Sequence, residues 1–231
     1  MPDFLSSSSF FAVALTLLIW RAAQALQKKT GSVLLHPILV SVAAIIAVLL
    51  LSGIPNSAYQ QGMKPFSWLM TPATVCLAVP LYEQVKVLKK NLPAILAGVL
   101  SGTVTSLVSV FLLGRLFRMD RTMLISLLPK SVTTAIGAPV SEALGGVGSI
   151  TVAAVIATGI LGSVLGPALC KWFRIADPIA QGTAIGTAAH VIGTSKANEM
   201  GAVQGAVGSF SLVSAGLLTA FLLPVMYSWL L

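Results

Sequence analysis

Charged residues are scarce in this chain of 231 residues. Only 9% are Asp, Glu, Lys or Arg, against 56% hydrophobic residues, whereas soluble domains carry about 25% charged residues. Such a chain could not cover a water-facing surface, which excludes a soluble globular domain. Its length is that of one domain, and no polar stretch is long enough to form a second, soluble one. We therefore expect a single integral membrane domain over residues 1–231.

Residues that bind metals or carry out catalysis are also few. Cys76 and Cys170 lie far apart inside apolar runs, and two histidines, His36 and His190, are too few for a multi-histidine site. The motifs of serine hydrolases, P-loop ATPases, zinc proteases and dinucleotide-binding enzymes are missing. We expect no metal, no cofactor and no enzymatic activity.

Basic residues outnumber acidic ones and give a formal net charge of +8. They are scattered over the short gaps between apolar runs and do not form a patch. The excess therefore indicates positive-inside topology and contact with the anionic lipid bilayer, and no nucleic-acid partner is expected.

Long apolar runs fill most of the chain. A helix needs about 20 apolar residues to cross the bilayer core. Backbone at membrane depth must bond within its own segment, so each run is predicted to be a helix. The expected fold class is an all-α polytopic membrane protein with about six transmembrane helices, joined in one place by a turn-rich connection, 53–65. The six runs are 4–26, 33–53, 66–84, 92–114, 147–170 and 203–231.

Two further segments, 122–146 and 178–200, are apolar enough for membrane depth but rich in Gly, Thr and Ser. If the N-terminus lies outside, the positive-inside rule places the loop with Lys171 and Arg174 inside only when 122–146 dips and returns. We therefore expect two broken or re-entrant segments. The basic residues expected on the cytoplasmic side are Lys28, Lys29, Lys89, Lys171 and Arg174.

The stretch "TPATVCLAVPLYE" (71–83) aligns without gaps with "KSVTTAIGAPVSE" (130–142), with Thr, Pro and Glu identical at three positions. Paired, proline-interrupted segments are typical of transporters built from repeats. Three identities also arise by chance, so an internal repeat and coincidence both stay open.

The first polar segment contains "LLPKSVTTAIGAPVSEALGG" (127–146). Pro129 and Pro139 break helical hydrogen bonding, and a helix N-terminus after such a break offers free N–H donors to an anion. A lysine and three hydroxyls add to this site. The alternative is a lysine that snorkels to an interface and hydroxyls that bond back to the helix. The candidate anion-binding residues are Lys130, Ser131, Thr133 and Thr134.

The second polar segment contains "QGTAIGTAAHVIGTSKANEMG" (181–201). Ionisable residues inside a membrane are functional by default because their burial is costly, and His190 is suited to carry a proton or to bond a carboxylate. The alternative is a histidine that packs between helices and an i,i+3 surface pair of Lys196 with Glu199. The candidates here are His190, Thr194 and Ser195 for substrate and His190, Asn198 and Glu199 for ion coupling.

Glu83 and several glycine pairs complete the candidate residues. Glu83 is a further ion-coupling candidate, but pairing with Lys86 is equally open. The glycine pairs have small-xxx-small spacing, which permits close helix packing. They are Gly162/Gly166, Gly182/Gly186 and Gly201/Gly205.

"LLPKSVTT" followed by "GTAAHVIGTSKANE" resembles the signature pair of the LrgB/CidB family, and "HPILV" and "AVPLYEQ" also fit it. The resemblance covers essentially the whole chain and implies a multi-pass protein of the bacterial inner membrane. The family includes holin-like regulators of murein hydrolase and autolysis, the plastidic glycolate/glycerate translocator, and proteins implicated in pyruvate uptake or export. A small LrgA/CidA-type membrane partner is implied as well. One departure is Ala135, where a proline commonly follows the double threonine.

The two polar segments are expected to meet in the protein interior and to form a midplane site for a small monocarboxylate such as pyruvate, glycolate or glycerate. Polar groups concentrated in two broken segments are the transporter pattern, whereas a holin-like pore would favour a continuous polar stripe. The alternative function is holin-like regulation of murein hydrolase activity and autolysis. We also expect a homo-oligomer, a dimer in the first place. Ser131, Thr133 and Thr134 are expected within reach of His190 or Thr194.

Overall fold

The computed structural model describes residues 9–31, 35–76 and 78–230, all of which lie in helices or short connections. The chain divides into two compact units, Met1–Cys76 and Leu77–Leu231, which are described separately. An all-α polytopic membrane protein is confirmed, since four helices among the described residues are long and apolar enough to cross a membrane. These are Phe10–Thr30, Val85–Leu116, Gly148–Trp172 and Ala202–Ser228.

The first unit contains α2 (Ser9–Thr30), α3 (Pro37–Ser52), α4 (Asn56–Gly62) and α5 (Lys64–Cys76). The expected connection 53–65 is therefore largely helical, which corrects that prediction. Gly53 ends α3 in the left-handed conformation (φ 66°) that glycine adopts without penalty. The hydroxyl groups of Thr16 on α2 and Tyr59 on α4 lie 2.8 Å apart and tie this short helix to the unit.

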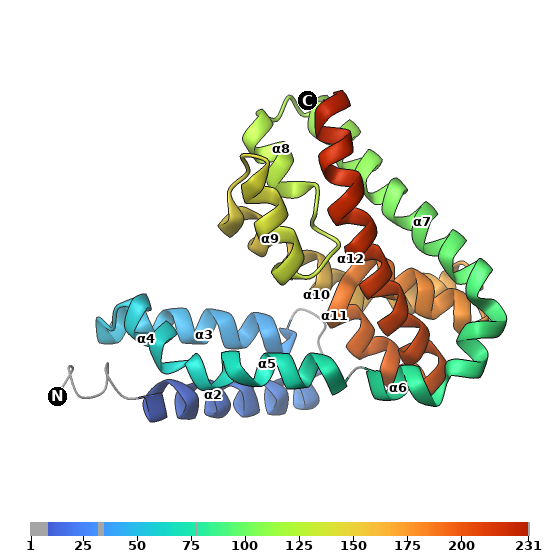
Figure 1. The fold of residues 1–231 in the computed structure, drawn as a ribbon. Coiled ribbons are helices and arrows are strands. Elements are labelled where there is room, and N and C mark those ends of the chain that lie inside the picture. The colour runs from blue at the N-terminus through green and yellow to red at the C-terminus, as the bar shows by residue number, and fades with distance from the viewer. Residues whose placement is uncertain (1–8, 32–34, 77, 231) are drawn as a thin grey trace. The chain divides into compact units, whose positions relative to one another are not determined.

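The second unit contains the remaining helices in the order shown in Figure 1. They are α6 (Ala78–Glu83), α7 (Val85–Leu116), α8 (Arg121–Leu127), α9 (Thr134–Ala143), α10 (Gly148–Trp172), α11 (Pro178–Met200) and α12 (Ala202–Leu230). The expected run 66–84 is divided between α5 and α6, with Leu77 outside the described residues. The exact number of membrane crossings, the single-domain assignment and the internal repeat stay predictions.

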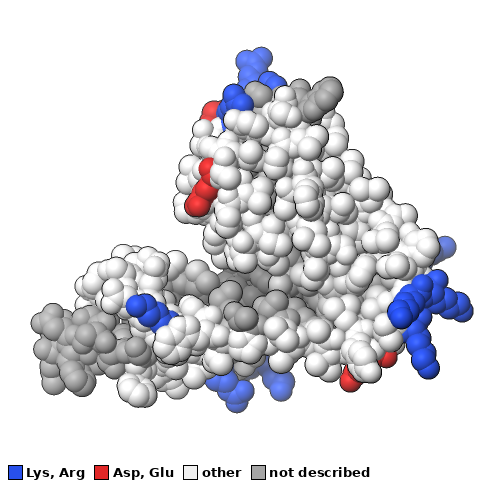
Figure 2. Space-filling model, viewed as in Figure 1, with Lys and Arg blue, Asp and Glu red and all other residues white. Residues whose placement is uncertain are grey.

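Helix α7 shows why these sequences form transmembrane helices. No charged residue lies between Lys90 and Arg115, a stretch of about 36 Å, which matches a bilayer core of about 30 Å. Figure 2 shows Lys and Arg gathered at the two ends of the second unit, with an almost uncharged face between them. We therefore expect the middle of this stretch, near Thr103, to lie near the bilayer midplane.

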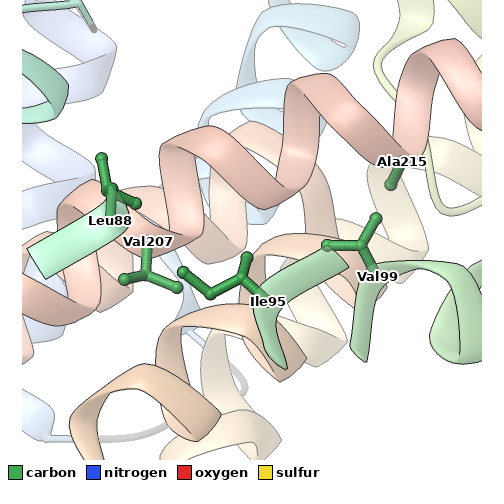
Figure 3. Packing of buried hydrophobic residues seen from close by; sticks show 5 residues of the cluster. All are labelled: Leu88, Ile95, Val99, Val207 and Ala215. Carbon is green, nitrogen blue, oxygen red and sulfur yellow. The ribbon is translucent and has the colours of Figure 1, made fainter. Parts of the chain in front are cut away.

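One face of α7 packs against α12. Leu88, Ile95 and Val99 of α7 point towards Val207 and Ala215 of α12 and form one buried cluster (Figure 3). The spacing of seven and four residues along α7 keeps these side chains on one helical face. Because lipid is as apolar as leucine, tight van der Waals contact holds these helices together.

The segment 122–146 forms a helical hairpin, which we call the first hairpin (residues 121–147). Helix α8 ends at Leu127, the chain turns through 128–133, and α9 runs back beside α8 (Figure 1). The N–H of Val147 then donates to Ser126 Oγ at 2.8 Å, so the chain after α9 returns beside the last turn of α8. Pro129 lies at the turn as expected, but Pro139 lies inside α9 and does not end it.

The segment 178–200 forms a second hairpin (residues 178–201) because α11 is broken at Ala189 and His190, whose backbone angles are not helical. Its two halves pack together, since Ile185 and Ala197 share one buried cluster. In a continuous helix these two residues would lie about 18 Å apart along the axis. The prediction of two broken segments is therefore confirmed.

The two hairpins enter the unit from opposite ends. Arg121, at the start of the first hairpin, lies 4.8 Å from the ring centre of Tyr227 near the end of α12. At the other end, Gln204 near the start of α12 donates from Nε2 to Gln181 Oε1 in the second hairpin at 3.2 Å. The tips of both hairpins consequently lie inside the unit, while their bases lie at its two ends.

Candidate functional site where the two hairpins meet

A small cavity of about 10 Å³ lies between the tip of the first hairpin and the second hairpin. We call the five hydroxyl side chains in its wall the hydroxyl cage: Thr103, Ser106, Ser131, Thr187 and Thr219. They come from α7, the first hairpin, α11 and α12, and apolar side chains complete the wall. The two polar segments therefore approach each other as expected, near the middle of α7, with Ser131 and Thr187 in one wall. The closer expectation, that Ser131, Thr133 and Thr134 lie within reach of His190 or Thr194, stays a prediction.

A much larger cavity of about 1280 Å³, here called the vestibule, lies next to the hydroxyl cage. Its wall begins near Asn91 and Phe173, at one end of α7 and α10, and reaches Lys130 and Ser131 in the first hairpin. Hydroxyl groups of α7, α10 and α11 line the vestibule along the way: Ser101, Thr105, Ser106, Ser109, Thr158, Thr183 and Thr187.

Lys130 lies at the inner end of the vestibule and forms no salt bridge with any acidic residue that the structure describes. Its Nζ donates to Ser131 Oγ at 3.2 Å, and Ser131 Oγ lies 3.0 Å from Ser106 Oγ of α7. In the described part of the chain, the ion pair that forms is Lys196 with Glu199, at 2.7 Å. The charge of Lys130 therefore lies at a cavity whose wall contains hydroxyl groups, and it forms no ion pair with a described residue.

Thr133 and Thr134 mark the helix N-terminus that the sequence predicts after the break. Thr133 is the N-cap residue of α9 but forms no side-chain capping bond, and Thr134 begins the helix. Neither lines the cage or the vestibule. Their backbone places free N–H groups of α9 close to Lys130 in the chain, as an anion would require.

His190 occupies the break in α11 and is 4% exposed. Its φ of 42° is rare for a residue with a side chain, and its Nε2 donates to the carbonyl of Val155 in α10 at 2.9 Å. It lines neither cavity. This geometry fits a histidine that fixes the turn between the halves of α11, while proton coupling stays a prediction.

The other predicted residues lie away from the cage. Thr194 is 1% exposed, with its methyl group near Gly208 of α12, whereas Ser195 and Asn198 are exposed. Glu199 forms the exposed i,i+3 pair with Lys196 that was the alternative to a functional role. Glu83 is exposed at the end of α6, and its role in ion coupling, like that of Asn198 and Glu199, stays untested.

Glycines allow the second hairpin to approach its neighbours closely. A Cβ atom added at Gly186 would collide with the backbone of Gly208 on α12, and one added at Gly162 would collide with Ala189. Close packing at these two glycine pairs is therefore confirmed. In the described chain, no group of three or more His, Cys, Asp or Glu side chains could hold a metal ion.

Comparison with known proteins identifies the family of this chain. The model of the LrgB-like family matches residues 16–229. The chain belongs to the LrgB-like family. It is similar to the "Uncharacterized protein YwbG" of Bacillus subtilis (strain 168), with 36% identity over 94% of this chain and 96% of the relative. No solved structure matches.

Other relatives of this LrgB-like chain have a name that refers to function. "Holin-like protein CidB" of Staphylococcus epidermidis and of Staphylococcus aureus is 36% identical over 93% of this chain and 93% of the relative. Coverage of this extent, together with the transmembrane helices, supports a role in a membrane for the family member described here.

Sequence reasoning missed the contribution of α7 and α12 to the site. Thr103, Ser106 and Thr219 lie in runs read as plain transmembrane helices, although the i,i+3 spacing of the first two was a signal for a polar spot on one face. Gly98 and Gly102 of α7 were missed as well. The methyl groups of Thr183 and Thr187 pack where Cβ atoms of these glycines would lie.

Proposed function

We propose that the protein carries a small monocarboxylate across the membrane and binds it at Lys130, at the inner end of the vestibule. The observation that supports this most is the position of Lys130, whose Nζ donates to Ser131 and forms no ion pair with an acidic residue in the described chain. A charge at membrane depth is costly and marks substrate pathways in transporters. A carboxylate bound there neutralises that charge.

The surroundings of Lys130 favour an anion over a cation. Hydroxyl groups of Ser106 and Ser131 lie within one hydrogen bond of each other, and α9 begins four residues after Lys130. The N-terminal N–H groups of a helix and the positive end of its dipole favour negative charge. Pyruvate, glycolate and glycerate are small enough for this place, and the larger vestibule provides their route.

The two cavities favour a carrier over an open pore. The vestibule extends from residues at one end of α7 and α10 to Lys130, while the adjoining hydroxyl cage has room for about one water molecule. A site that adjoins a large cavity and a small one, between two hairpins from opposite ends, is compatible with the alternating access of transporters. Movement of a hairpin tip would then expose Lys130 to the other side.

The test is uptake of labelled pyruvate or glycolate into liposomes that contain the purified protein and a large entrapped dye. A carrier takes up the carboxylate and retains the dye. Uptake should be lost in Lys130→Ala, with membrane insertion intact. No uptake by the unmodified protein, under either a proton or a sodium gradient, would refute the proposal.

A second candidate function is holin-like regulation of murein hydrolase activity and autolysis. The name of the relatives, "Holin-like protein CidB", favours this function. The geometry of the cavities does not explain a holin-like function. Leakage of the dye in the same liposomes, without saturable carboxylate uptake, would decide for this function. Under either function we propose a location in the bacterial cytoplasmic membrane, a homodimer, and a small LrgA/CidA-type membrane partner.

A further inference from the structure

We propose that the hydroxyl cage is a specificity subsite that binds the oxygen on C2 of the carboxylate while Lys130 binds its carboxyl group. This inference rests on the proposed function and assigns new roles to Thr103 and Thr187. It predicts that the protein prefers 2-oxo and 2-hydroxy acids over simple fatty acids of the same length.

Two hydroxyl groups of the cage lack a hydrogen-bond partner. Thr103 and Thr187 are 3% and 5% exposed, and neither Oγ1 atom has a partner among the described residues. Because a buried hydroxyl without a partner costs free energy, these side chains favour a polar ligand atom beside them. A methylene group in the same place would leave both hydroxyls unpaired.

The orientation of Thr187 supports this role. Its methyl group packs against Gly102 of α7, 3.0 Å from the place of a Cβ atom there. The hydroxyl on the same carbon is therefore turned away from this contact. Thr183, one helical turn earlier, packs its methyl group against Gly98 in the same way but lines only the vestibule.

The hydroxyl cage lies next to the charged group of Lys130. Ser106, Ser131 and Thr187 line both the cage and the vestibule, so the wall between the two cavities carries hydroxyl groups. Lys130 Nζ lies 3.2 Å from Ser131 Oγ in that wall. A carboxyl group at Lys130 therefore has its neighbouring carbon, C2, next to the entrance of the cage.

The size of the cage selects the group that enters. A volume of about 10 Å³ corresponds to about one water-sized probe, which suits a single carbonyl or hydroxyl oxygen. Sites that bond a substrate oxygen strongly reject analogues that lack it, because their polar groups are then left unpaired. Each neutral hydrogen bond lost is expected to weaken binding by about 10-fold.

Pyruvate and propionate provide the test, because propionate has a methylene group where pyruvate has its C2 carbonyl. Binding of both acids is measured on the full-length protein in lipid nanodiscs, for the unmodified chain and for Thr187→Val and Thr103→Val, which replace the hydroxyl with a methyl group. We expect the unmodified protein to prefer pyruvate by about 10-fold or more. Either variant should lower this preference about 10-fold, with propionate affinity unchanged.

Two control variants separate the hydroxyl from general packing. Thr187→Ser keeps the hydroxyl and should keep the preference, and Thr183→Val should keep it because Thr183 does not line the cage. The inference is overturned if both acids bind but Thr187→Val and Thr103→Val leave their ratio unchanged, or if Thr183→Val changes the ratio equally. If neither acid binds to the unmodified protein, the proposed function fails together with the inference.

Discussion

Replacing Lys130 with methionine tests the anion site while keeping most of the side-chain volume. Two unit charges 4 Å apart interact by about 4 kcal/mol at an effective dielectric constant of 20. The vestibule beside Lys130 is wide enough for water, and Ser131 and the N-terminus of α9 remain as donors. We therefore expect a net loss of about 2–3 kcal/mol, which corresponds to about 30–150-fold weaker binding of pyruvate.

The assay is titration of pyruvate against the protein in nanodiscs, followed by initial uptake rates in liposomes. Lys196→Met is the matched control, because it removes the exposed pair with Glu199 and such pairs contribute about 0–1 kcal/mol. Lys130→Arg keeps the charge and should retain part of the binding. If Lys130→Met binds pyruvate within about 3-fold of the unmodified protein, the lysine snorkels and the anion site is wrong.

Three further predictions follow from the hairpins. His190→Gln should keep the pH profile of transport and part of its rate, because the amide also donates a hydrogen bond, while His190→Ala should lose transport; a flattened pH profile in His190→Gln would instead mark a proton carrier. A cysteine at Asp177 should resist labelling by impermeant reagents outside intact cells, and ready labelling would mean that 122–146 crosses fully. Gly186→Ala should lower the unfolding temperature, since its Cβ meets the backbone of Gly208 and overpacking costs about 1–3 kcal/mol. Gly166→Ala should have a milder effect, because its Cβ meets only the side chain of Ile185, at 3.2 Å. Equal unfolding temperatures of the two variants would contradict this packing.

Much of the architecture follows from composition. The segments 122–146 and 178–200 combine membrane hydropathy with Gly, Thr and Ser, which predicts irregular backbone sheltered by protein. The break at Pro129 also follows, since proline lacks the N–H that a helix needs. Pro139 has the same property but lies inside α9, because a single lost bond in a packed helix is tolerated.

The rest depends on tertiary contacts that local patterns do not encode. The break in α11 has no proline, and the His190 side chain at this break is hydrogen-bonded to Val155 in another helix. The hydroxyl cage unites Thr103 with Thr187 and Thr219, which lie on three helices far apart in sequence. Thr103 and Thr219 are ordinary residues of apolar runs, and Thr187 is one of several hydroxyls in the second polar segment, so their shared cavity becomes visible only in the folded protein.

The most direct test of the central claim is a crosslink between the two hairpins. Cysteines replace Ser131 and Thr187, which line the same cavity of about 10 Å³, in a chain whose own Cys76 and Cys170 are changed to serine. The reduced double variant should exchange labelled pyruvate more slowly than the unmodified chain, because it lacks two hydroxyls of the site. Oxidation should join the pair within one chain and stop this remaining exchange, and reduction should restore it to the level of the reduced variant. A reduced double variant that exchanges pyruvate but forms no disulfide, or one that continues to exchange when fully oxidised, would contradict a substrate site between the hairpin tips.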